Sequence, residues 1–150
     1  MKLEEEIKQT KPFNSEFQKL ALNISFTSSW LNSIFSEHLK TFDITPHQYN
    51  VLRILRGRYP ESYCNQEIAQ RMIDKSSNST RIVDKLIEKK MVSKIYDKID
   101  RRLVNIKIIE KGLKLLEEID KLGFTEIINM NNLTEERAKL MNEWLDELRG

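Results

Sequence analysis

Two short stretches in the middle of this chain carry side chains suited to contacting a polyanion. The first is a run of short polar groups that ends in an arginine: Ser76, Ser77, Asn78, Thr80 and Arg81. Hydroxyl and amide groups beside an arginine supply the donors and acceptors that read base edges and phosphates in DNA. Serine and threonine also gather at helix starts as caps. Three hydroxyl groups in one cluster exceed what capping needs, so we favour DNA contact.

The second stretch contains Lys98, Asp100, Arg101 and Arg102, between two segments of alternating hydrophobicity. An arginine on a projecting hairpin can enter the minor groove of DNA, whose negative potential attracts it. The acid two residues before Arg102 can pair with the guanidinium and hold it in one direction. The alternative is a solvated turn, whose exposed ion pairs are worth only ~0–1 kcal/mol each.

The charge distribution agrees with this interpretation. Residues 71–111 contain 12 Lys or Arg and 6 Asp or Glu, a net charge of +6. The whole chain has a net charge of +2, so the remaining residues sum to −4. A basic middle with acidic flanks is expected of a protein that binds nucleic acid, although a charged solvated surface would also produce it.

The elements around these stretches predict a winged helix-turn-helix. A short helix carries Ile68, Ala69 and Met72, and a second helix begins near Asp74 to Ser76. The second helix turns Ile82, Val83, Leu86 and Ile87 inward and its polar first turns outward, as a recognition helix does. Residues 91–96 and 103–108 then alternate with a period of two, which predicts a hairpin.

The ends of the chain predict helices that form a separate lobe. Residues 15–40 show apolar residues at helical spacing, and Thr45 with Pro46 marks the next helix start, a helix that ends in a loop containing Gly57. Another helix starts at residues 110–112 and carries Ile127, with Gly123 as a kink. A last helix follows Thr134. We expect a charged arm at residues 1–12, a DNA-binding lobe at about 44–111, and a helical dimerisation lobe from 13–40 and 112–149. The fold class is mainly α with a small β-hairpin wing.

Other function classes find little support in the sequence. The chain has no Gly-rich phosphate loop, no His or Cys pair at metal-binding spacing and no paired nucleophile and base, so we expect neither an enzyme nor a cofactor. His38 and His47 are isolated and are interpreted as surface or cap residues. No apolar run approaches the ~18 residues of a membrane span, and the first residues lack the apolar core of a signal peptide. One cysteine suits a reducing cytoplasm.

These motifs together resemble the MarR family of winged-helix transcriptional regulators over residues 44–116. The residues that carry the likeness are Glu67-Ile68-Ala69, Arg81 through Leu86, Asp100-Arg101-Arg102 and Lys111-Gly112. The resemblance implies a homodimer that binds a pseudo-palindromic operator, with Arg102 in the minor groove and Asp100 orienting it. It also implies a repressor that a small effector releases.

The sequence departs from the family at two points. Lys90 stands where the family has glycine after the recognition helix, and Ile109-Glu110 replaces Leu-Thr before Lys111. Both departures concern local geometry and spare the DNA-facing residues.

The effector and the mode of regulation stay open at this level. The resemblance implies a pocket for a small aromatic or amphipathic compound, which Trp30 and Tyr49 could line; core packing is the alternative for both. Cys64 raises a redox alternative, but no Lys, Arg or His lies within two positions to stabilise a thiolate. A winged-helix module that binds protein and not DNA is the other alternative; it would not need a basic wing.

Overall fold

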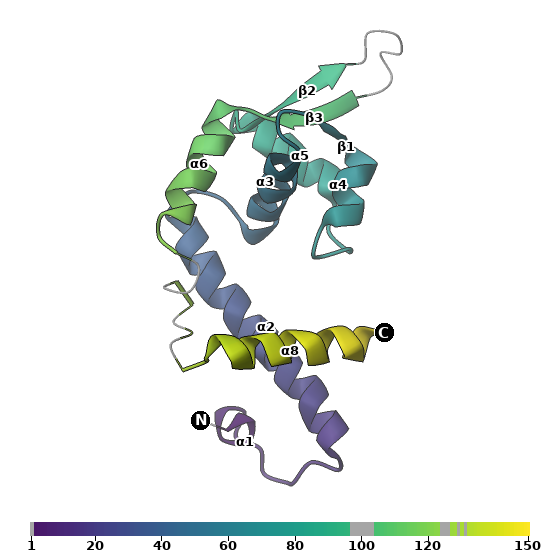
Figure 1. Ribbon diagram of the computed structural model, residues 1–150, viewed down its shortest axis with the longest axis vertical. Helices are drawn as coiled ribbons and strands as arrows, with labels where there is room; N and C mark the ends of the chain where they lie inside the picture. The colour runs from purple at the N-terminus through teal and green to yellow at the C-terminus, as the bar shows by residue number, and fades with distance from the viewer. Residues whose placement is uncertain (1, 97–103, 124–126, 129, 131) are drawn as a thin grey trace.

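The computed structural model describes residues 2–96, 104–123, 127–128, 130 and 132–150. One lobe holds the sheet and helices α3 to α6, and the long helix α2 leads away from it toward α1 and the N-terminus (Figure 1). Helix α8 crosses the lower half of α2 in this view. The elements are α1 Leu3–Glu6, α2 Glu16–Lys40, α3 Pro46–Arg58, β1 Tyr63–Cys64, α4 Asn65–Arg71, α5 Ser79–Glu88, β2 Val92–Tyr96, β3 Val104–Ile108, α6 Glu110–Asp120 and α8 Glu135–Arg149.

Local caps start the long helices where the sequence predicted. The Ser15 hydroxyl accepts from the Gln18 N–H at 3.2 Å and begins α2. Thr45 and Gln48 form a reciprocal capping box at the start of α3, with Pro46 in the first helical position. At the other end, α8 begins after Thr134, whose hydroxyl accepts from the backbone of its first turn.

Three expectations for the ends of elements are wrong. Gly57 lies inside α3 and not in the following loop, because the helix continues to Arg58. Helix α6 ends at Asp120, and Gly123 follows with φ 69°, a left-handed conformation that stops a helix. Ile127 is therefore not on α6. Residues 1–12 are not simply an arm, since they contain α1, whose Leu3 is buried.

The sheet is antiparallel with the order β1-β3-β2. Strands β2 and β3 pair from Val92 with Ile108 to Tyr96 with Val104, which is the hairpin predicted from the period-two pattern. Ile106 and Ile108 on β3 are buried beneath the helices. Gly112 lets α6 lie against this sheet, because a Cβ there would come within 2.5 Å of the Met91 carbonyl oxygen.

The hydrophobic core belongs to the lobe that contains the sheet. Each Leu or Ile side chain that is fully buried in this core contributes about 1.5–3 kcal/mol to the stability of the fold. Within the described ranges, Leu39 is the only buried residue of α2, and no residue of α8 is buried. None of the helices in the described part of the chain is long and apolar enough to cross a membrane. The fully buried side chains are Leu39, Val51, Leu52, Leu55, Ile68, Met72, Leu86, Ile108 and Leu116.

Candidate nucleic-acid interface

The helix-turn-helix consists of α4, a turn of residues 72–78 that we call the α4–α5 turn, and α5. Helix α5 begins at Ser79, so the predicted start near Asp74 to Ser76 is wrong. The reason is local: the Asp74 carboxylate accepts from both the backbone N–H and the hydroxyl of Ser76, at 2.9 and 2.7 Å. These bonds favour a turn over a helix. Asn78 then caps α5 by accepting from the Arg81 N–H at 3.1 Å.

The predicted contact residues divide between this turn and the first turn of α5. Ser76 and Ser77 lie before the helix, and the Ser77 hydroxyl donates to the Asp74 carbonyl at 2.7 Å. The Thr80 hydroxyl accepts from the amide of Asn65 on α4. Turn formation and capping thus account for much of the hydroxyl cluster. Arg81 is exposed, and its guanidinium has no partner among the described residues.

Three further contacts orient α5 against its neighbours. Lys94 on β2 pairs with Asp84 on α5 at 3.2 Å, and Lys89 at the end of α5 pairs with Asp43 at 2.9 Å. The Lys111 ammonium donates to the Lys89 carbonyl at 2.9 Å, which joins α6 to the same helix end. Sequence spacing gave no signal for these contacts, because each joins elements that are separate in the chain.

Lys90 adopts the left-handed conformation that the family's glycine would have. Its φ is 57°. Its N–H bonds the Ile87 carbonyl at 2.9 Å, and the next N–H, of Met91, bonds the Leu86 carbonyl at 3.0 Å. This is the hydrogen-bond pattern of a Schellman cap. The chain therefore forms this cap without a glycine, at the cost of a left-handed conformation in a residue with a Cβ. At the second departure, Ile109 precedes α6 without a side-chain cap.

The predicted wing residues Lys98, Asp100, Arg101 and Arg102 lie outside the described residues, and their roles stay predictions.

At the edge of the sheet, the Tyr63 ring lies beneath two guanidiniums, with Arg71 at 4.3 Å and Arg58 at 5.4 Å from its centroid. These cation–π contacts hold two positive charges on the lobe.

The N-terminus of α4 is capped by Glu67. Its carboxylate accepts from the Cys64 N–H at 2.9 Å. The pKa of Glu67 is lowered mainly by this hydrogen bond from the Cys64 backbone. The Cys64 side chain and the Arg71 charge lower the pKa further.

The two residues proposed to line an effector pocket are separate in the structure. Trp30 on α2 is 46% exposed, whereas Tyr49 on α3 packs edge-on against Phe35 with ring centroids 5.0 Å apart. No contact joins Trp30 to Tyr49 in the described parts of the chain. For Tyr49, packing between α2 and α3 accounts for the side chain. An open groove of about 570 Å³ runs along the polar face of α2 and includes neither aromatic; its lining is Ser28, Ser29, Asn32, Ser33, Ser36, Glu37 and Lys40.

A carboxylate at the end of α6 joins this helix to α3. Asp120 accepts from Arg53 at 2.9 Å and from Arg56 at 2.7 Å. An acid at a helix C-terminus is unfavourable to the helix dipole, and the two guanidiniums offset it. Arg53 also donates to the Tyr49 hydroxyl at 3.3 Å, so the contacts continue from α6 through α3 to α2.

Comparison with known proteins finds similar chains that are named as transcriptional regulators. No family model matches the chain. The HTH-type transcriptional regulator MhqR of Bacillus subtilis is 28% identical over 128 residues, which cover 85% of this chain and 87% of MhqR. A MarR transcription factor from Planctomyces limnophilus is 26% identical, with a TM-score of 0.67, and the match covers 92% of this chain and 98% of that one.

A MarR mutant from E. coli, solved in complex with operator DNA, is 22% identical with a TM-score of 0.77, and the match covers 92% of this chain and 99% of that one. At this identity the likeness shows the fold alone. The predicted fold class, mainly helical with a small β-hairpin wing, is confirmed.

Proposed function

We infer that this chain is a DNA-binding transcriptional regulator of the MarR type, and that it binds a pseudo-palindromic operator as a homodimer. The observation that carries this proposal is a helix-turn-helix beside an antiparallel wing, in the stretch of the chain with a net charge of +6. In such folds the second helix enters the major groove, and lysine and arginine neutralise phosphates around it. The operator complex of the E. coli MarR mutant supports the same mode of binding.

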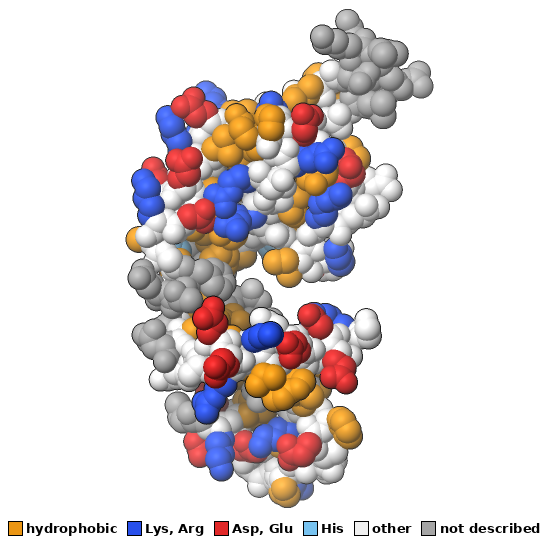
Figure 2. Space-filling model, in the orientation of Figure 1, with side chains coloured by type: hydrophobic (Ala, Val, Ile, Leu, Met, Phe, Trp, Pro, Cys, Tyr) orange, Lys and Arg blue, Asp and Glu red, His pale blue; other side chains and the backbone are white. Residues whose placement is uncertain are grey.

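The second subunit would cover apolar surface that the single chain leaves exposed. Phe17 on α2 is 86% exposed and Trp144 on α8 is 62% exposed. A patch of hydrophobic side chains, with charged side chains around it, lies in the lower half of the molecule near α8 (Figure 2). Contiguous apolar patches of this kind mark association surfaces in soluble proteins. A dimer through α2 and α8 would place its recognition helices about one turn of DNA apart, ~34 Å.

Release by a small effector extends this proposal. The relatives that support DNA binding are transcription regulators, and a repressor freed by an aromatic or amphipathic compound is the form that the resemblance implies. A protein-binding winged helix is the alternative. A module of that kind would not bind DNA, so a measurement of DNA binding distinguishes the two functions.

The test is selection of bound duplexes from a random pool, followed by titration of the recovered duplex at several salt concentrations. Arg102→Ala should weaken binding and lower the slope of log K against log salt by about 0.9 for each phosphate that the variant no longer neutralises. Asp100→Ala should weaken binding too, although it removes a negative charge near DNA, because Asp100 orients the arginine. Arg81→Ala should instead relax base preference, by roughly 1–3 kcal/mol at one or two positions. Recovery of no duplex by the parent protein would refute DNA binding.

A further inference from the structure

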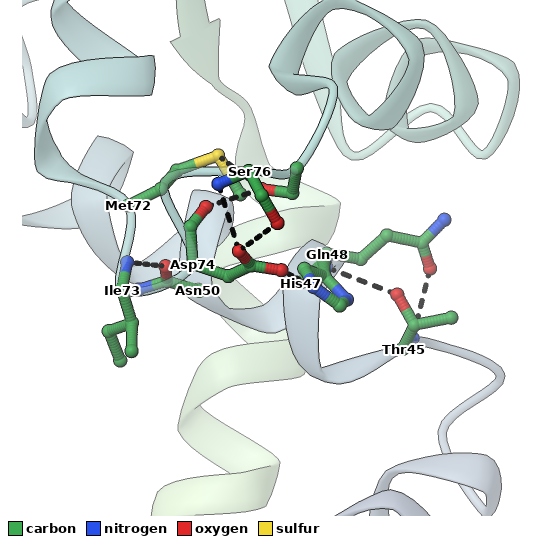
Figure 3. Close-up of polar contacts among 9 residues, drawn as sticks. Thr45, His47, Gln48, Asn50, Met72, Ile73, Asp74 and Ser76 are labelled. Atoms are coloured by element: carbon green, nitrogen blue, oxygen red, sulfur yellow. Dashed lines mark hydrogen bonds and ion pairs between the residues drawn. The ribbon is translucent and has the colours of Figure 1, made fainter.

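The α4–α5 turn is fastened to α3 at two points. The His47 Nε2 atom lies 3.0 Å from Asp74 Oδ2, and the Ile73 N–H donates to Asn50 Oδ1 at 2.9 Å. Figure 3 shows both contacts, with His47 and Asn50 reaching from α3 to the turn. The two α3 residues are three positions apart, so they lie on the same side of the helix. Capping of α3 does not require them, because Thr45 and Gln48 perform it.

Asp74 connects this fastening to the start of α5. One of its oxygens faces His47, and the other accepts both hydrogen bonds from Ser76. The Ser76 hydroxyl and then His47 lower the pKa of Asp74 to about 2, so the carboxylate is ionised at neutral pH. The turn that Asp74 shapes leads directly to Asn78, which caps α5. The position of the turn therefore sets where the first turn of α5, with Arg81, begins.

Burial of apolar surface does little to fix this turn. Ile73 is 87% exposed, and Asp74, Lys75 and Ser76 are exposed as well. Within residues 72–78, Met72 is the one buried side chain. The side chains of His47 and Asp74 are each 46% exposed. A contact between groups this exposed contributes little to overall stability, but it can still hold an exposed turn in one place.

We propose that His47 and Asn50 are positioning residues of the DNA interface, which hold the α4–α5 turn so that the start of α5 meets the duplex in one orientation. This inference rests on the proposed function. The two residues act through Asp74 and the Ile73 backbone and do not themselves contact DNA. Helix α3 would then take part in DNA recognition. The sequence alone indicates only that α3 packs in the core and carries an isolated histidine.

The experiment titrates single-residue variants with a duplex that the parent protein recovers from a random pool. His47→Ala and Asn50→Ala should each weaken binding about fivefold, the usual worth of one hydrogen bond. His47→Gln places an amide N–H near the position of Nε2 and should restore most of the affinity. Asn50→Asp keeps the accepting oxygen for Ile73 and should likewise bind better than Asn50→Ala. The midpoint of thermal unfolding should move by less than about 3 °C in all four, since the contacts are exposed.

A matched pair of charge variants separates positioning from simple electrostatics. Asp74→Ala and Glu110→Ala each remove one carboxylate; Glu110 is exposed and pairs with Lys114 on α6, away from the turn. Coulomb attraction alone predicts equal or tighter binding for both. The positioning role predicts weaker binding for Asp74→Ala and unweakened binding for Glu110→Ala.

Amide hydrogen exchange reports on the turn without DNA. Exchange of the Ile73 N–H should accelerate in Asn50→Ala, and that of the Ser76 N–H in His47→Ala, with core amides unchanged. Unchanged affinity in His47→Ala and Asn50→Ala would overturn the positioning role alone. So would a weakening that follows the unfolding midpoint and is not rescued by His47→Gln. A parent protein that recovers no duplex overturns the proposed function, and the positioning role with it.

Discussion

Replacing Lys90 by glycine is expected to stabilise the protein. Lys90 follows the C-cap of α5 with φ 57°, and a residue with a Cβ pays about 1–2 kcal/mol for this conformation. Glycine avoids that strain but loses more chain entropy on folding, by about 0.5–1 kcal/mol. The difference is a gain of about 0–1.5 kcal/mol in the free energy of unfolding, with a central value of about 0.75 kcal/mol. At ~2–4 °C per kcal/mol for a chain of this size, Tm should rise by about 1–4 °C.

The control is Lys90→Ala, which removes the same charge and keeps the Cβ. The Lys90 side chain is exposed and has no partner among the described residues, and the cap itself uses only backbone groups. Alanine should therefore leave Tm where it is. Calorimetry must compare the proteins at one fixed concentration, because Tm of a dimer depends on concentration. Equal stabilisation by alanine and glycine, or a lower Tm for glycine, would refute the argument from backbone strain.

Four other changes test separate parts of the structure. Gly112→Ala should lower Tm by several degrees, because the added Cβ would overlap the backbone carbonyl of Met91 and overpacking costs about 1–3 kcal/mol. The folded-state pKa of Asp74 is lowered from 3.8 to about 2, so its contribution to stability is present above pH ~4 and lost as pH falls toward 2; the Tm difference between the parent and Asp74→Ala should shrink over that range. Cys64→Ser should leave the peroxide response of DNA binding unchanged, since the sequence places no Lys, Arg or His within two positions of Cys64 and a nearby cation is what activates a cysteine. If the proposed dimer forms through α8, Trp144→Asp should convert it to a monomer in sedimentation at micromolar concentration, and a parent protein that is itself a folded monomer would contradict the proposal.

Features that depend on neighbouring residues could be predicted from the sequence. Thr45 with Pro46, and Thr134 before α8, mark helix starts because a cap bonds the backbone two or three residues away. The alternation in β2 and β3 predicts the hairpin for the same reason. The start of α5 was missed although its cause is also local. Asp74 is as good a helix cap as Asn78, and only its bonds to Ser76 show that it forms a turn instead.

Contacts between distant segments could not be predicted. Asp120 meets Arg53 and Arg56 across more than sixty residues, and the pairing of His47 with Asp74 spans 27. A single sequence without the fold does not indicate which exposed charges meet. The same limit explains why the sequence suggests Trp30 and Tyr49 together as pocket residues: both are aromatic, but their surroundings differ.

The structure separates what holds the lobe together from what orients the face that we propose reads DNA. Leu86 and Val83 anchor α5 in the core from its inner side, and that burial accounts for most of the stability of the helix. Its ends and flank are oriented by exposed polar contacts, Asn65 with Thr80, Lys94 with Asp84, and Lys89 with Asp43. Exposed pairs of this kind contribute only ~0–1 kcal/mol each to folding.

Substitutions in the polar contacts should therefore change DNA affinity more than Tm, whereas substitutions at the buried face should lower both. The proposed DNA-reading face cannot be fixed by burial, because its outer side must stay free if it is to meet the duplex. Polar contacts at the periphery of α5 are the remaining means of orienting it. The two contacts from α3 hold the turn that precedes α5 and add to these contacts, which is why residues outside the helix-turn-helix are expected to affect operator binding.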